Sequence, residues 1–72
     1  MTGGWIHTVY RNGAWANELE GDRVLSWHDS HAEAENAGTA FARERRTVHV
    51  IHGEDGRVVR WTLHTLQVVA EG

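Results

Sequence analysis

The dipeptide Asn12-Gly13 constrains the fold of this chain more than any other short stretch. Asn-Gly is the strongest short-range signal for a β-hairpin, because both central residues of a type I′ turn need a positive φ angle. Residues 5–10 before it and residues 14–20 after it alternate apolar and polar side chains, which predicts two antiparallel strands. A second turn at Gly21-Asp22 leads into a third predicted strand at residues 23–28.

The hydrophobic period changes at Ser30, where Ser30-His31-Ala32-Glu33 has the sequence of a capping box. In such a box the serine hydroxyl accepts a hydrogen bond from the glutamate N–H, and the glutamate side chain reaches back to the serine N–H. Small apolar residues then recur at helical spacing as far as Phe41, and arginines occupy the last turn, where the helix dipole favours positive charge. These features predict a helix over residues 31–45 that can lie close against a sheet.

Two further strands are predicted after the helix, at residues 47–52 and 57–63, joined by the hairpin loop at residues 53–56. Residues 65–70 are again β-prone, and they either lengthen the last strand or form a sixth one. The expected order is βββαββ in one small domain over residues 1–72. This order predicts an α+β, two-layer fold, an antiparallel sheet with one helix packed on one face and a possible extra C-terminal strand.

The composition limits how so small a domain is stabilised and which chemistry it performs. The 72 residues include no cysteine and no lysine, which excludes disulfides, cysteine-based zinc sites and Schiff bases. Tryptophan packing or self-association is expected to supply the missing support. We expect Trp15, Trp27 and Trp61 to belong mainly to the core, and Trp5 to be the best candidate for an exposed contact.

The charge and hydropathy of the chain exclude other classes of protein. The formal net charge of −3 disfavours general binding to phosphate backbones, which depends on clustered lysine and arginine. No apolar run approaches the ~20 residues that span a bilayer, and no segment resembles a signal peptide. We therefore expect a soluble, cytoplasmic protein without a membrane partner.

No arrangement of residues predicts a catalytic, cofactor or metal site. His28 and His31 are three residues apart, as are His49 and His52, but a strand pair at that spacing points to opposite faces of the sheet. Zinc needs three or four convergent ligands, so the histidines are expected to be surface or half-buried residues. The adjacent carboxylates of the 53–56 loop are expected to be too exposed for tuned acid–base chemistry. We predict that the protein is not an enzyme.

Three motifs, taken in order, resemble those of a small bacterial family. They are the strand segment from Gly13-Ala14-Trp15-Ala16 to Glu20-Gly21, the helix start His28-Asp29-Ser30-His31-Ala32-Glu33-Ala34, and the hairpin Val50-Ile51-His52-Gly53-Glu54-Asp55-Gly56-Arg57-Val58. Over roughly residues 6–60 the chain resembles the domain of unknown function numbered 2188, a resemblance that implies a fold and no established activity. Residues 61–72 then form a β-prone C-terminal extension of this family-like core.

A looser similarity connects the chain to the arm-type DNA-binding domain of phage integrases. Those domains lay an exposed sheet face into the major groove, which requires cations on that face. The second predicted strand instead offers an asparagine and two glutamates. The matching positions here are Trp15, Trp27, Ser30, Glu33 and Ala34.

The excess of β-prone sequence after residue 60 suggests a function in protein–protein contact. An added strand must pair with something, because an open edge exposes unpaired N–H and C=O groups, and a second copy related by a two-fold axis would provide that pairing. We predict a non-catalytic interaction or regulatory accessory module of bacterial or phage origin, acting as a homodimer or bound to a larger protein. The candidate contact residues are Trp5, Leu66, Val68 and Val69.

Two alternatives from other classes stay open. The first is a nucleic-acid-binding module that uses the exposed sheet face or the basic cluster Arg43, Arg45 and Arg46, although these arginines also compensate the dipole at the end of the helix. The second is a pH or metal sensor based on the six histidines, which gain charge as the pH falls from about 7 to 5.

Overall fold

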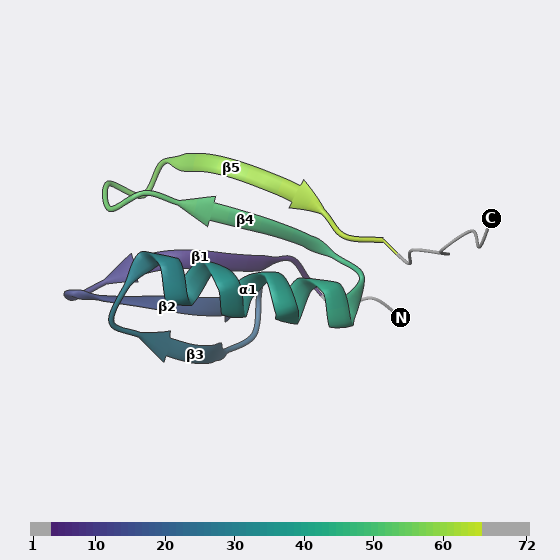
Figure 1. Ribbon diagram of the computed structural model, residues 1–72, viewed down its shortest axis with the longest axis horizontal. Coiled ribbons are helices and arrows are strands. Elements are labelled where there is room, and N and C mark those ends of the chain that lie inside the picture. Colours follow the sequence, from purple (N-terminus) through teal and green to yellow (C-terminus); the bar gives the residue numbers. More distant parts are fainter. Residues whose placement is uncertain (1–3, 66–72) are drawn as a thin grey trace.

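The computed structural model describes residues 4–65, and it begins with the predicted meander of three strands (Figure 1). Strand β1 (Ile6–Arg11) pairs antiparallel with β2 (Ala14–Leu19), and β2 pairs antiparallel with β3 (Val24–His28). Asn12 and Gly13 have φ angles of 50° and 87°. The positive φ angles at both positions are those of the predicted tight hairpin turn.

Helix α1 (His31–Arg45) begins and ends where the sequence predicts. The Ser30 hydroxyl accepts a hydrogen bond from the backbone N–H of Glu33 at 3.1 Å, which caps the first turn. At the other end Arg46 adopts a left-handed conformation with a φ angle of 54°, and its N–H bonds back to carbonyls of the last turn. This left-handed residue stops the helix and turns the chain toward the sheet.

After the helix, β4 (Val48–His52) and β5 (Val58–Leu63) form an antiparallel hairpin that joins the sheet on the far side of β1. The strand order is β3-β2-β1-β4-β5 (Figure 1), and the α+β class is confirmed. The expectation of an entirely antiparallel sheet needs correction, because β1 and β4 run parallel, with Ile6 opposite His49. The helix causes this: it returns the chain so that β4 runs in the direction of β1, as a helical crossover allows.

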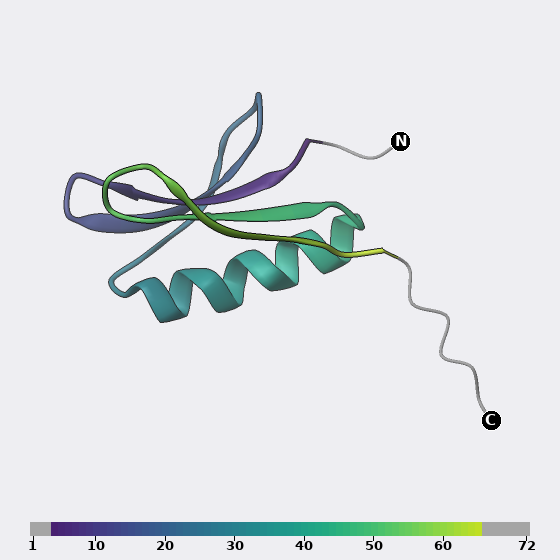
Figure 2. The same cartoon turned by 90° about the horizontal axis from the view of Figure 1, so that it is seen from above.

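Helix α1 lies across one face of the sheet and leaves the other face open (Figure 2). Its inward stripe consists of the small residues Ala34, Gly38 and Ala42, all buried, so the helix packs closely against β1 to β4. Ile6 and Ile51 fill the space between the layers, at 0% and 3% exposure. Most of the core therefore lies on the covered face.

Two of the tryptophans that we expected in the core are exposed. Trp27 and Trp61 have 56% and 64% of their surface in solvent, whereas Trp15 is buried at 8%. Trp15 stacks on His31 at the start of α1, with ring centroids 4.3 Å apart. The alternation of strand side chains sends Trp27 and Trp61 to the face opposite α1, where no described element covers them. Trp5 is exposed, as predicted.

The predicted sixth strand falls largely outside the described residues, since 66–72 are not described. Within the described part, His64 and Thr65 follow β5 without belonging to a strand. No helix among residues 4–65 is long and apolar enough to cross a membrane.

Candidate interaction surface on the open face of the sheet

Apolar side chains form a groove at the β4–β5 end of the open face. Five residues line it, and we call it the tryptophan groove: Trp5, Val48, Val50, Val58 and Trp61. Val48 and Val50 form the floor, at 8% and 5% exposure, while Trp5, Val58 and Trp61 form exposed walls. Its volume is about 260 Å³. The groove thus combines a dry apolar floor with two tryptophans that reach solvent.

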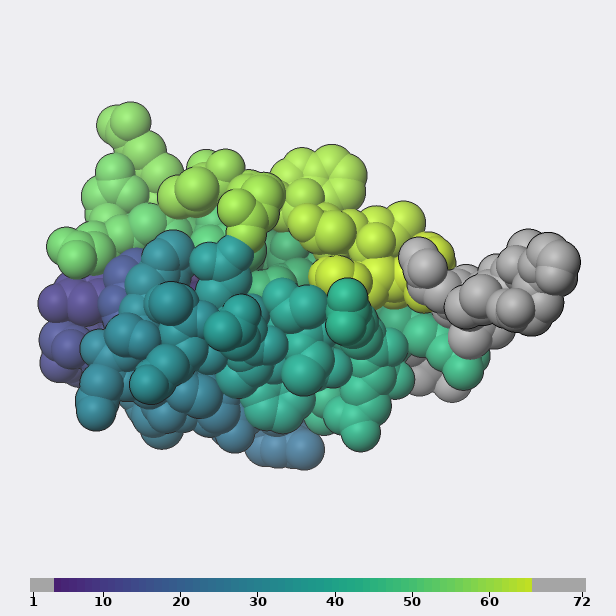
Figure 3. All heavy atoms as spheres, viewed as in Figure 1, coloured from purple at the N-terminus to yellow at the C-terminus, as the bar shows by residue number. Residues whose placement is uncertain are grey.

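Strand β5 forms the outer border of this groove and is exposed along its whole length. All six of its residues are exposed, and Val59 and Trp61 each have 64% of their surface in solvent. Figure 3 shows the green-to-yellow atoms of this strand beside the helix rather than beneath it. Helix α1 reaches β5 through an ion pair between Glu35 and Arg60, but it does not pack on the strand. A strand with so little packing on either side has apolar surface available for a partner.

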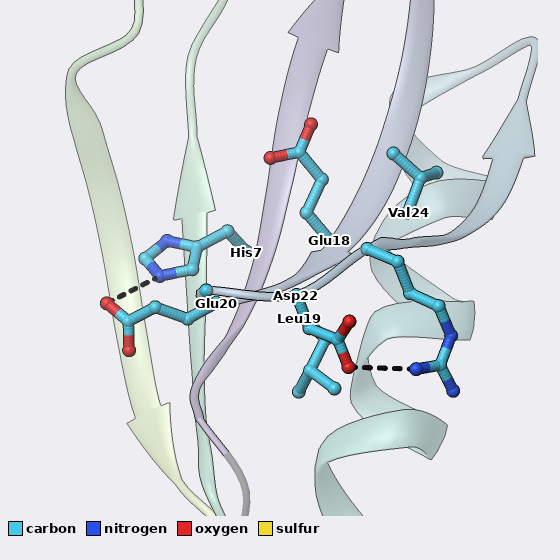
Figure 4. A pocket seen from close by; sticks show the side chains of 8 residues that line it. His7, Glu18, Leu19, Glu20, Asp22 and Val24 are labelled. Carbon is cyan, nitrogen blue, oxygen red and sulfur yellow. Dashed lines mark hydrogen bonds and ion pairs between the residues drawn. The ribbon is translucent and has the colours of Figure 1, made fainter.

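Toward the middle of the open face, polar side chains replace the apolar ones. His7 Nδ1 lies 2.9 Å from His52 Nε2. On the other side of the ring, His7 Nε2 lies 3.4 Å from a Glu20 carboxylate oxygen (Figure 4). His52 Nδ1 in turn contacts the Gly56 carbonyl at 3.1 Å, and a carbonyl oxygen requires a donated proton. His52 Nδ1 therefore carries the proton of its ring, and His52 Nε2 accepts the proton that His7 Nδ1 donates.

A shallow pocket of about 440 Å³ next to His7 contains three carboxylates that do not converge. In Figure 4 the side chains of Glu18, Glu20 and Asp22 point in different directions, and Glu20 contacts His7. Glu18 instead makes two hydrogen bonds to the Arg11 guanidinium, which holds the pKa of this carboxyl below its usual value. Within residues 4–65 no group of three or more His, Asp or Glu side chains is arranged to hold a metal ion.

The covered face contains a buried polar network beneath the helix. Thr8, Asn17 and His49 come from three adjacent strands and are 0%, 0% and 1% exposed. Thr8 Oγ1 donates to Asn17 Oδ1 at 2.6 Å and lies 2.7 Å from His49 Nε2, while Asn17 Nδ2 donates to the Ala34 carbonyl at 2.9 Å. Gly38 lies over all three, and a Cβ there would come within 2.5 Å of Asn17 and His49. The glycine lets the helix approach these polar groups.

Proton counting fixes the state of His49. Thr8 has one hydroxyl proton and donates it to Asn17, so His49 Nε2 must carry the proton of the Thr8–His49 bond. His49 Nδ1 then accepts from the Thr39 hydroxyl at 3.5 Å, and the ring is neutral. Burial, with a further contribution from His64, lowers the pKa of His49 from 6.5 to about 4. The expectation that the histidines are surface or half-buried is therefore wrong for His49, because its position on β4 faces α1.

The structure places the other predicted contact residues as follows. Trp5 is a wall of the tryptophan groove, but Leu66, Val68 and Val69 lie outside the described residues. The predicted separation of His49 and His52 onto opposite faces is confirmed: His49 lies under α1 and His52 contacts His7 on the open face.

The basic cluster at the end of α1 is spread over different environments. Arg45 lies over the Phe41 ring at 5.7 Å and within 3.6 Å of Glu44, while Arg43 and Arg46 are exposed. Five of the seven arginines pair with a carboxylate, in the pairs Arg11–Glu18, Arg23–Asp22, Arg45–Glu44, Arg57–Asp55 and Arg60–Glu35. These pairs reduce the positive charge available to phosphates, and the nucleic-acid hypothesis stays a prediction.

Comparison with known protein families agrees with this fold. Residues 6–60 match the model of an uncharacterized protein family conserved in bacteria, DUF2188. The chain belongs to this family. The DUF2188 match covers β1 to β4, the helix and the first three residues of β5, so the tryptophan groove lies within it except for Trp5 and Trp61. No curated protein and no solved structure matches the chain.

Sequence reasoning overlooked Trp61 and Val58 as surface residues. The composition of residues 58–63 contains the signal that could have identified them. Apolar side chains occur at both odd and even positions of this strand, and the even positions also include an arginine and a threonine. A single 15-residue helix cannot cover five strands, so an outer strand of this kind must remain exposed.

Proposed function

We propose that this DUF2188 protein is a non-catalytic protein–protein interaction module, acting as a homodimer or as an accessory to a larger protein. Its binding surface is the tryptophan groove together with the edge of β5. The observation that carries this proposal is the exposure of β5: all six residues face solvent beside a groove lined by apolar side chains. Apolar surface of this kind, next to a free strand edge, supports a role in binding another protein.

The chemistry of the groove supports a protein partner. Tryptophans dominate the binding energy of protein interfaces when they are packed in a desolvated pocket, and Trp5 and Trp61 stand on either side of a dry floor. The polar groups of the open face are largely paired with one another, as in Arg11–Glu18 and His7–His52. A partner therefore gains most by covering the apolar end of the face.

The experiment compares the wild-type chain with Trp61→Asp as immobilised baits in an extract of the native host. Trp61→Asp adds a charge to the groove at an exposed position, so the fold is expected to persist while partner retention falls about 30-fold, the effect of losing a ~2 kcal/mol contact. Ala32→Asp is the matched control, because it adds the same charge to an exposed residue of the helix layer. Quantitative mass spectrometry measures retention, and equal retention by wild type and Trp61→Asp would contradict the proposal.

A further inference from the structure

Among residues 4–65 no strand pairs with the outer edge of β5, where the last residues of this strand present backbone groups. His64 N–H donates to the Thr47 carbonyl at 3.1 Å, so residue 64 directs its backbone groups toward β4. This direction alternates along an antiparallel strand, and Leu63 and Trp61 therefore turn their N–H and C=O groups away from β4. Two donors and two acceptors face outward at this edge, where another strand can pair with them.

The ladder is regular over the same stretch. The irregularity in the β4–β5 pairing lies between Ile51 and His52, and from Arg60 opposite Ile51 to Leu63 opposite Val48 the register does not shift. Side chains of Trp61 and Leu63 both point to the open face, and both are more than half exposed, at 64% and 56%. The strand is therefore regularly paired with β4, and apolar on one side, at the place where its backbone groups face outward.

We propose that β5 pairs antiparallel with β5 of a second copy of this chain, about a two-fold axis through Thr62. This inference rests on the proposed function, because it names the partner of the same surface. In this register Trp61 of each copy lies opposite Leu63 of the other, and each such pair exchanges two backbone hydrogen bonds. All four outward groups of each copy are then satisfied.

The charges of the strand favour a second copy as the partner. Sheet edges normally prevent self-pairing with lysine, proline or inward-pointing charges, and this chain has neither lysine nor proline. The central residues Trp61, Thr62 and Leu63 are uncharged, so the two-fold axis brings no like charges together. The nearest charge, Arg60, is drawn toward the helix by its ion pair with Glu35.

Other registers use the edge less well. An axis through Trp61 would place Leu63 opposite Val59, which lies within the irregular part of the strand. The opposite edge of the sheet is also less suited, because the β2–β3 ladder shifts between Asn17 and Glu18 and α1 packs against β3. The Thr62 axis is perpendicular to the sheet, and it puts both helices on one face and both tryptophan grooves side by side on the other.

A single cysteine tests this register, since the chain has no native cysteine. Across the proposed axis Thr62 faces its own copy as a non-hydrogen-bonded pair, with about 4.5 Å between the two Cα atoms, a separation that a disulfide spans. Thr62→Cys is expected to convert mostly to a disulfide-linked dimer under mild oxidation. Arg60→Cys is the matched control on the same strand, because its two copies lie about 13 Å apart in this register, beyond the reach of a disulfide.

Analytical ultracentrifugation of the 72-residue wild-type chain provides the second measurement. We expect a dimer at micromolar concentration and, because both copies lose the Trp61 contact, an increase of about 1,000-fold in the dissociation constant for Trp61→Asp, with unchanged circular dichroism. A wild-type monomer, or equal cross-linking of Arg60→Cys and Thr62→Cys, would overturn the inference. If the chain is monomeric while Trp61-dependent capture of another protein persists, the inference fails and the proposed function stands; if both are absent, both fail.

Discussion

On the face of the sheet that α1 covers, the buried side chains include Thr8, Asn17 and His49, whereas on the open face Trp5, Trp27 and Trp61 reach solvent. Hydrophobicity alone would assign these two groups the other way round. The difference arises because the inward helix residues Ala34, Gly38 and Ala42 have little or no side chain. The helix backbone therefore lies close enough to the sheet for Asn17 to donate a hydrogen bond to a helix carbonyl. Hydrogen bonding therefore contributes to the stability of the covered face, and the open face keeps apolar side chains in solvent.

The largest expected effect on the covered face is a loss of stability in acid, and it comes from His49. Its pKa is lowered by burial from 6.5 to about 4, so the unfolded chain binds a proton at higher pH than the folded one. The contribution of His49 to the free energy of unfolding is therefore fully present above pH 6.5 and decreases as the pH falls toward 4. In total this group lowers the free energy of unfolding by about 3 kcal/mol.

Urea unfolding at pH 7, 6, 5 and 4 measures the effect of His49. The matched variant is His49→Gln, which retains a donor toward Thr8 but does not titrate, and its stability is expected to depend less steeply on pH than that of the wild type. Parallel curves for the two proteins would show that His49 does not carry this acid sensitivity.

Gly38 gives the next largest effect. Replacing an exposed helical glycine with alanine normally stabilises a helix by about 1 kcal/mol. Here the added Cβ would lie 2.5 Å from both Asn17 Oδ1 and His49 Nε2, and both atoms are held in the buried network. We expect Gly38→Ala to destabilise the protein by about 2 kcal/mol, since overpacking a filled interior forces its groups apart.

Thermal and chemical denaturation test this prediction against Ala40→Gly, an exposed position of the same helix. That control is expected to lose about 1 kcal/mol by the ordinary helix propensity, so both directions of the glycine–alanine exchange destabilise the protein. A Gly38→Ala variant more stable than the wild type would mean that the helix does not lie as close to the network as the distances indicate.

Local sequence signals predicted the elements of this fold well. Asn12-Gly13 and Ser30 act over a few residues, and the hairpin and helix start occur where these residues place them. The parallel pairing of β1 with β4 depends on where the helix delivers the chain, which is a long-range property without a local sequence signal. The strand order therefore required the structure.

The candidate interaction surface was harder to predict than the fold. Strand alternation shows which tryptophans share a face but does not say which face the helix covers, and Trp15 and Trp61 illustrate the two outcomes. The choice depends on the fit between helix and sheet, here on the close approach of the helix at Gly38. His49 was misjudged for the same reason, because its burial follows from the covered face and not from its residue type.

The smallest expected effect concerns the polar pair of the open face, Arg11 and Glu18. Their side chains make two hydrogen bonds of 2.8 and 3.0 Å, and the arginine side chain is 53% exposed. A double-mutant cycle with Arg11→Met and Glu18→Gln is expected to give a coupling energy of about 0.5 kcal/mol that decreases at 1 M salt, because solvent screens a pair at the surface. Hydrogen-bonded polar groups would then contribute less to stability on the open face than they do in the buried network of the covered face. A salt-independent coupling above about 2 kcal/mol would instead indicate that the open face excludes water there as the covered face does.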